Sequence, residues 1–209
     1  ELMKRSILTI STAAAALLLA GLLARADDAA IVAKVEARLE KAKLTREGQI
    51  TVTADQGAVT LDGAVTTVAA RRAAEKAALK EAKVVENRLR VVPEERPDSE
   101  VAKDVRSEIL RYPFYTVFDS VELAVNDGVV TLAGSVQREN RKRDIESAIS
   151  DVRGVREIKN EIHVQPVSIF DDQLRTQLAR RIYGSEDFVH YANQVNPPIR
   201  ILVDRGRIT

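Results

Sequence analysis

Aromatic side chains and an arginine lie together near the middle of the chain. The group consists of Arg111, Tyr112, Phe114, Tyr115 and Phe118. Aromatic rings beside an arginine suit the surface of an anionic membrane, because the rings insert at the interface while the guanidinium attracts phosphate headgroups. The alternative is that the rings close the end of a hydrophobic core, and this is the interpretation we favour for Phe118.

A run of basic residues forms the second candidate site. It contains Arg138, Arg141, Lys142 and Arg143, within residues 137–143. A helix is expected to begin here, and cations at a helix N-terminus are unfavourable by about a few tenths of a kcal/mol each. A bound phosphate would reverse that sign, since free backbone amides and arginine side chains both favour it. A solvated charged face is the alternative, and for this run it is the favoured one.

Residues suited to catalysis or metal binding are scarce. The chain has no cysteine and two histidines, His163 and His190, which lie far apart in the sequence. No histidine pair at helical spacing and no glycine-rich phosphate loop is present, so metal ligation and nucleophilic catalysis lack their residues. We therefore expect a protein that is not an enzyme and that uses no metal and no cofactor.

The first residues have the pattern of a secretory signal peptide. Lys4 and Arg5 precede an apolar run over residues 7–24, and the sequence Ala-Arg-Ala at 24–26 supplies the small residues of a cleavage site. We expect residues 1–26 to be removed and the protein to be exported to the periplasm, with a retained membrane anchor as the alternative. The lack of cysteine argues against a lipoprotein and against a disulfide framework.

The remaining chain is nearly neutral. The whole sequence has 32 Lys and Arg against 31 Asp and Glu, and loss of residues 1–26 leaves 29 basic and 30 acidic residues. A broadly basic surface of the kind that binds nucleic acid is therefore not expected. A hydrophobic share of 45% and a charged share of 30% are ordinary for a soluble globular protein.

An internal repeat indicates which elements hold the candidate residues. The sequence QGAVTLDGAV at 56–65 returns as DGVVTLAGSV at 127–136, and the chain ends on DRGRIT. The two sequences start about 70 residues apart. A repeat with so long a period is a small domain with its own core and not one turn of a solenoid. We place the copies at residues 27–93, 97–166 and 170–209.

The third copy stops inside its hairpin. Without the rest of the repeat, its first helix would leave an apolar stripe largely uncovered, and a two-stranded hairpin is marginal alone. We expect the chain to be a fragment or a truncated gene product. We also expect the residues after Pro166 to pack poorly or to pair with a neighbour.

Each copy begins with apolar residues four apart, which predict an amphipathic helix. An alternating strand, a tight turn, a returning strand, a second helix and a final strand follow, so the order is helix, strand, strand, helix, strand. The expected fold class is α+β, a tandem of small domains in which a three-stranded mixed sheet packs on two helices. The helix stripes are Ile31, Val35 and Leu39; Val101, Val105 and Ile109; and Leu174, Leu178 and Ile182.

Structural roles are expected for the glycines and asparagines of the repeat. Glycine accepts positive φ in the hairpin turns, and the glycines at the ends of the returning strands allow a bend or a close backbone approach. The first copy lacks a glycine before its last strand, so its turn there is expected to differ. The residues concerned are Gly57, Gly63, Gly128, Gly134, Gly154, Asn87 and Asn160.

The combined motif resembles the BON domain of bacterial envelope proteins. It reads G-x-V-T-L-x-G-x-V at 57–65 and again at 128–136, and in the second copy a helix and V-x-x-I-x-N-x-I at 155–162 follow. The resemblance implies a periplasmic or envelope-attached protein without enzymatic activity, linked to osmotic and envelope stress. It also implies binding to phospholipid surfaces or to partner proteins. With the aromatic and basic residues of the second copy, we expect the partner to be an anionic phospholipid surface, and the alternative is a protein-interaction or chaperone-like module that engages periplasmic proteins.

Overall fold

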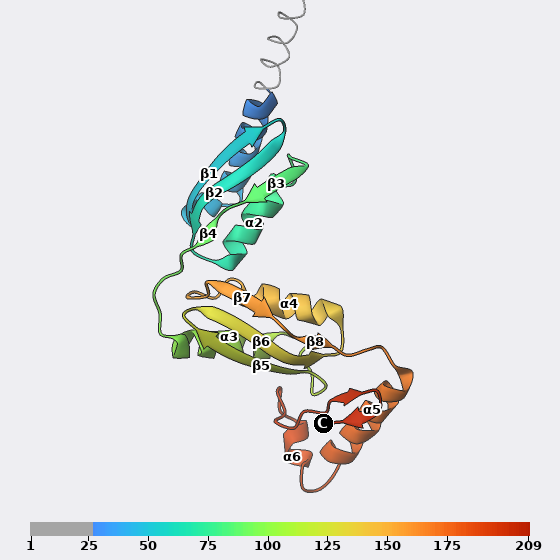
Figure 1. Ribbon diagram of the computed structural model, residues 1–209. Helices are drawn as coiled ribbons and strands as arrows, with labels where there is room; N and C mark the ends of the chain where they lie inside the picture. The colour runs from blue at the N-terminus through green and yellow to red at the C-terminus, as the bar shows by residue number, and fades with distance from the viewer. Residues whose placement is uncertain (1–26) are drawn as a thin grey trace, which may run out of the picture. The chain divides into compact units, whose positions relative to one another are not determined.

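The computed structural model describes residues 27–209, and the predicted signal peptide lies outside these residues. The described chain falls into two compact units, residues 27–66 with 70–92 and residues 67–69 with 93–209. Helices and mixed sheets build both, so the predicted α+β class is confirmed (Figure 1).

The first copy of the repeat forms one small mixed sheet with its helices. Its central strand β2 pairs antiparallel with β1 and parallel with β3 and β4. The predicted element order is therefore confirmed, with the final strand in two short pieces. The elements are a helix over residues 27–41, the 3-10 helix η1 (Leu44–Arg46), β1 (Gly48–Asp55), β2 (Ala58–Val65), α2 (Val68–Ala78), β3 (Val84–Asn87) and β4 (Arg90–Val91).

The second copy repeats this arrangement. Strand β6 is central, pairing antiparallel with β5 and parallel with β7 and β8. The elements are α3 (Asp98–Arg111), β5 (Ser120–Asn126), β6 (Val129–Val136), α4 (Glu139–Ile149), β7 (Glu157–Asn160) and β8 (His163–Val164).

The core of the second copy is made by the residues that the periodicity selects. They come from the stripe of α3, from alternate positions of β6 and from one face of α4, and each is fully buried. Burial of one such side chain is worth about 1.5–3 kcal/mol. These residues are Val101, Val105, Val130, Leu132, Ile145 and Ile149.

One side-chain contact recurs at the hairpin of every copy. In the first copy the Asp28 carboxylate accepts hydrogen bonds from the backbone N–H groups of Gln56 (3.0 Å) and Gly57 (2.7 Å). Both turn residues have positive φ, 51° and 80°, as tight hairpin turns require. In the other copies Asp98 binds Asp127 and Gly128, and Asp171 binds Arg205 and Gly206, at 2.9–3.0 Å.

The asparagine of the last strand fixes that strand to the second helix. In the second copy, Asn160 Nδ2 donates to the Lys142 carbonyl (3.2 Å) and to Glu146 Oε2 (2.8 Å), and Asn160 Oδ1 accepts from the Ile162 N–H (3.3 Å). The last bond spans the gap between β7 and β8. Asn87 makes the equivalent bonds in the first copy, to Arg71, Glu75 and Leu89.

The glycines near the ends of the returning strands lie against the neighbouring strand. A Cβ on Gly134 would meet the Ser120 carbonyl oxygen at 2.2 Å, and one on Gly63 would meet that of Gln49 at 2.1 Å. Only glycine lets the two strands approach this closely. Gly154 lies in the turn before β7, where a Cβ would meet Val101 Cγ2 at 2.6 Å.

The third copy contains a long helix and a short hairpin. The alternating residues Ile199, Ile201 and Val203 predict a strand here, but the strand β9 begins only at Val203. The antiparallel pair that follows has two residues in each strand. The elements are α5 (Ile169–Tyr183), α6 (Val189–Ala192), β9 (Val203–Asp204) and β10 (Arg207–Ile208).

Packing within the third copy is uneven. The α5 stripe of Leu174, Leu178 and Ile182 is only half-buried, as expected for a helix with too little sheet to cover it. Ile201 and Val203, by contrast, are buried. The expectation of poor packing therefore holds for the stripe of α5 and not for the chain that leads into the hairpin.

Candidate functional site

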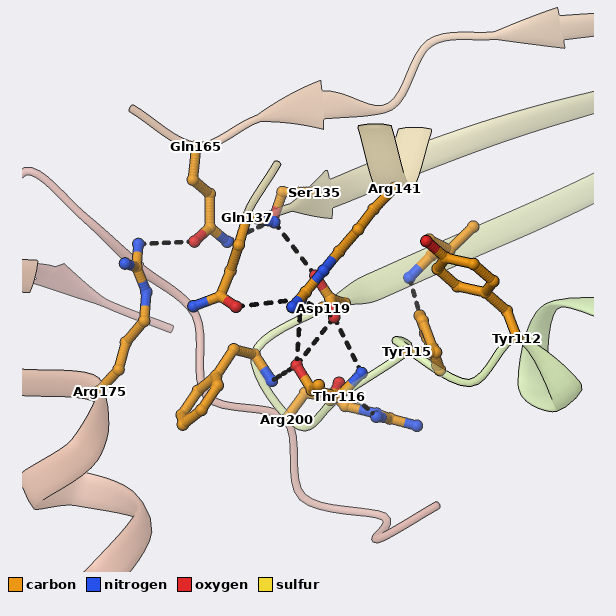
Figure 2. A network of polar contacts seen from close by, with 12 residues as sticks. Tyr112, Tyr115, Thr116, Asp119, Ser135, Gln137, Arg141, Gln165, Arg175 and Arg200 are labelled. Atoms are coloured by element: carbon orange, nitrogen blue, oxygen red, sulfur yellow. Dashed lines mark hydrogen bonds and ion pairs between the residues drawn. The ribbon is translucent and has the colours of Figure 1, made fainter. Parts of the chain in front are cut away.

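A buried carboxylate organises the residues around the two candidate sites of the second copy. Asp119, directly before β5, is 0% exposed. Its Oδ2 accepts hydrogen bonds from the Thr116 N–H (2.9 Å) and hydroxyl (2.8 Å), and its Oδ1 accepts from the Gln137 N–H (3.1 Å). Figure 2 shows these groups converging on the carboxylate from the loop before β5 and from the start of α4.

Arg141 completes this network. Its Nη1 lies 2.6 Å from Asp119 Oδ2 and also donates to Gln137 Oε1 (3.0 Å) and Thr116 Oγ1 (3.3 Å) (Figure 2). The side chain is 13% exposed. The guanidinium of Arg141, one of the cations expected at a headgroup, thus faces inward and neutralises a buried acid.

The aromatic residues of the first candidate site point in different directions. Tyr112 donates its hydroxyl to Asp144 Oδ2 at 2.7 Å, and burial together with this bond raises the pKa of Tyr112 to about 12. Tyr115 is half-buried, and its hydroxyl accepts a hydrogen bond from the Val121 N–H at 3.1 Å. Phe114 is 62% exposed and meets Tyr112 edge to face, with 5.7 Å between ring centroids. Only Phe114 among these three presents most of its ring to solvent.

The remaining cations differ in exposure. The Arg111 side chain is 71% exposed and forms an ion pair with Glu108 at 2.5 Å, one turn back on α3. Arg138 and Arg143 are exposed, and Lys142 is half-buried. Arg138 is the residue at which α4 is capped, without a side-chain cap bond, so the predicted helix start is correct.

Within residues 27–209, no group of His, Cys, Asp and Glu is placed to hold a metal ion. In the same part of the chain, none of the helices combines the length and apolar character needed to cross a bilayer.

The BON domain family matches the sequence twice, over residues 27–93 and 97–166, which together make up more than half of the chain. The chain belongs to the BON domain family. BON domains are binding modules typical of the periplasm and cell envelope, and the family is generally non-enzymatic.

Two similar solved structures are of a structural protein of a bacterial secretion system. The C-terminal domain of CdsD, a structural protein of the type III secretion system of Chlamydia trachomatis, is 16% identical with a TM-score of 0.29, over 66% of this chain and 67% of that one. A second CdsD structure is 15% identical with a TM-score of 0.31, over 69% and 66%. Among curated proteins no match was found.

Reasoning from the sequence missed a second polar group, at the C-terminal edge of the second BON domain. Gln165 Nε2 donates to Ser135 Oγ (3.0 Å), and the buried Arg175 of α5 donates to Gln165 Oε1 (2.6 Å) (Figure 2). Arg175 also donates to Asp172 Oδ1 (2.6 Å) and to the Val203 carbonyl. The α5 stripe was defined by its apolar residues, so a charged residue inside the helix gave no signal.

The first copy has a related contact. Glu47 lies directly before β1, one position before the residue that aligns with Asp119, and its Oε2 accepts a hydrogen bond from Thr66 Oγ1 (2.8 Å) in front of the second helix. An acidic residue thus bonds the start of the second helix in both BON domains.

Proposed function

We propose that this protein is a non-enzymatic periplasmic module whose second BON domain binds anionic phospholipid surfaces, in envelope maintenance under osmotic stress. The supporting observation is the exposure of Arg111, the last residue of α3, and of Phe114, three residues later. Between them, Tyr112 anchors the segment through its hydrogen bond to Asp144. Insertion of the ring and attraction of the guanidinium to phosphate would act in the same direction.

Arg138, Lys142 and Arg143, at the start of α4, are the further cations of the proposed lipid contact. Their contribution is electrostatic, about 1 kcal/mol for each basic residue near an anionic surface, and it falls with ionic strength because salt screens exposed charges. Arg141 is left out of this set because Asp119 holds it.

Flotation with vesicles tests the proposal. The chain beginning at Asp27 is expected to float with phosphatidylglycerol vesicles at low salt, to float less at high salt, and to stay behind with phosphatidylcholine. Phe114→Ser combined with Arg111→Glu is expected to reduce the partition constant at least about tenfold, because both the apolar and the charge contribution are lost.

The matched control makes the same two changes in the first BON domain. Leu79 and Arg88 are exposed there, and Leu79→Ser combined with Arg88→Glu is expected to leave flotation unchanged. Equal losses in the two double variants would refute a lipid site at the end of α3. Binding that ignores lipid charge and salt would favour the alternative, a module for periplasmic proteins.

A further inference from the structure

The segment between the second BON domain and α5 exposes large apolar side chains. In residues 167–170, Val167, Ile169 and Phe170 are 95%, 73% and 82% exposed. The remaining residue of this segment, Ser168, caps α5: its hydroxyl accepts a hydrogen bond from the Asp171 N–H at 3.2 Å. The cap fixes the backbone, so the apolar side chains are held on a defined turn. Soluble proteins rarely expose adjacent large apolar residues in this way.

The repeat itself does not require apolar residues at these positions. Asp171 of α5 and Asp98 of α3 make the same contact with a hairpin turn, and this contact aligns the two copies residue by residue. Polar residues and a proline serve at the equivalent positions of the second copy, which folds completely. The residues that correspond to Val167, Ile169 and Phe170 are Glu94, Arg96 and Pro97.

Positive charge lies beside the exposed segment. Val167 lines a hollow of about 220 Å³ together with Arg138, Arg175 and Asp172. Arg175 is 3% exposed, and its Nε has no hydrogen-bond partner among the described residues. Two cations and one carboxylate leave the lining of the hollow with a net positive charge.

We infer that residues 167–170 form an apolar wedge that inserts into an anionic lipid surface while Arg138 contacts headgroup phosphate. The wedge lies outside both BON matches, so it adds a second contact that the BON domains do not supply. The occupant is a lipid surface because apolar side chains here adjoin a positively charged hollow, a combination that suits acyl chains beneath phosphate. This inference rests on the proposed function and adds where the membrane is met.

A single tryptophan reports insertion directly, because the chain has none. Phe170→Trp is expected to show a blue shift of its emission, and protection from an aqueous quencher, when phosphatidylglycerol vesicles are added to the chain beginning at Asp27. Val195→Trp is the matched control, since Val195 is 91% exposed in the same copy but lies outside the wedge. Its emission is expected to stay unchanged.

A loss-of-binding variant complements the reporter. Ile169→Ser combined with Phe170→Ser is expected to lower the partition constant into phosphatidylglycerol vesicles about tenfold or more, since burial of either side chain alone is worth about that factor. Val195→Ser is expected to have no effect. Because all three side chains are exposed, circular dichroism and unfolding midpoints are expected to match those of the parent chain.

The outcomes separate this inference from the proposed function. If the parent chain floats but the tryptophan emission of the Phe170→Trp variant does not shift, the wedge is refuted and lipid binding by the second BON domain stands. If the parent chain floats with neither vesicle, both fail. If the emission of this variant shifts with protein concentration in the absence of lipid, the segment binds a second copy and the inference is overturned.

Discussion

At the scale of single residues, the burial of Asp119 decides what its neighbours can do. Its carboxylate is fully buried and lies 2.6 Å from Arg141. Asp119→Ala would leave the guanidinium without a counter-charge and the Thr116 and Gln137 N–H groups without this acceptor. We expect the free energy of unfolding to fall by about 3–5 kcal/mol, measured by urea denaturation. Glu108→Ala, which breaks the exposed pair with Arg111, is expected to cost about 1 kcal/mol or less, and equal losses would contradict the role assigned to Asp119.

The same residues show how far a basic run can be interpreted from the sequence. The run at 137–143 was correctly placed at the start of a helix, but its four cations were treated alike. Helical spacing divides them: Arg141 and Lys142 lie four and three residues before the buried Ile145, and both are half-buried, whereas Arg143 is exposed. The spacing could therefore have assigned Arg141 to the inner face, whereas the identity of its partner could not be found that way, because Asp119 is distant in sequence.

At the scale of elements, an aspartate joins the first helix to the hairpin in each copy. Asp98→Ala removes the carboxylate that accepts hydrogen bonds from the Asp127 and Gly128 N–H groups, in a turn where both residues have positive φ. We expect a loss of about 1.5–3 kcal/mol in unfolding free energy, and faster hydrogen exchange at the Asp127 and Gly128 amides. Glu100→Ala on the same helix is the control, because it removes only an exposed ion pair with Arg96. Unchanged exchange at the turn would show that the turn does not depend on Asp98.

Hydrophobic periodicity predicted the elements of both BON domains and their order, since the spacing of apolar residues shows which face of a helix or strand is buried. Periodicity could not predict the polar contacts between elements. The bonds of Asp98 to the turn and of Asn160 to the Lys142 carbonyl of α4 join polar side chains to backbone groups 29 and 18 residues away, separations that no local period records. Recurrence of the same residue types in two or three copies was the available signal.

At the scale of the whole molecule, the third copy belongs to the same compact unit as the second BON domain. The Ile201 N–H donates to the Val117 carbonyl at 2.8 Å, and Asn196 Nδ2 donates to the Leu110 carbonyl at 3.1 Å. The repeat pattern predicted an incomplete copy that packs poorly or pairs with a neighbour. It could not predict that backbone carbonyls at the end of α3 and in the loop after it would supply the contacts, because every backbone carries such groups.

Arg200 makes this association testable. Its Nη1 donates to the Thr116 carbonyl at 2.9 Å, and its guanidinium lies 4.7 Å from the centroid of the Tyr115 ring. The third copy therefore covers one side of the loop between α3 and β5, residues 112–119. Arg200→Ala is expected to speed hydrogen exchange at Ile201 and in the loop after α3, because one hydrogen bond and one cation–π contact are lost together. Arg205 is an exposed arginine of the same copy, and Arg205→Ala is expected to leave hydrogen exchange in that loop unchanged.

If the two variants show the same hydrogen exchange, the third copy is not held on the second BON domain through Arg200. If only Arg200→Ala loosens the loop, access to Tyr115 is set by the third copy, and lipid binding by this variant is expected to exceed that of the parent chain.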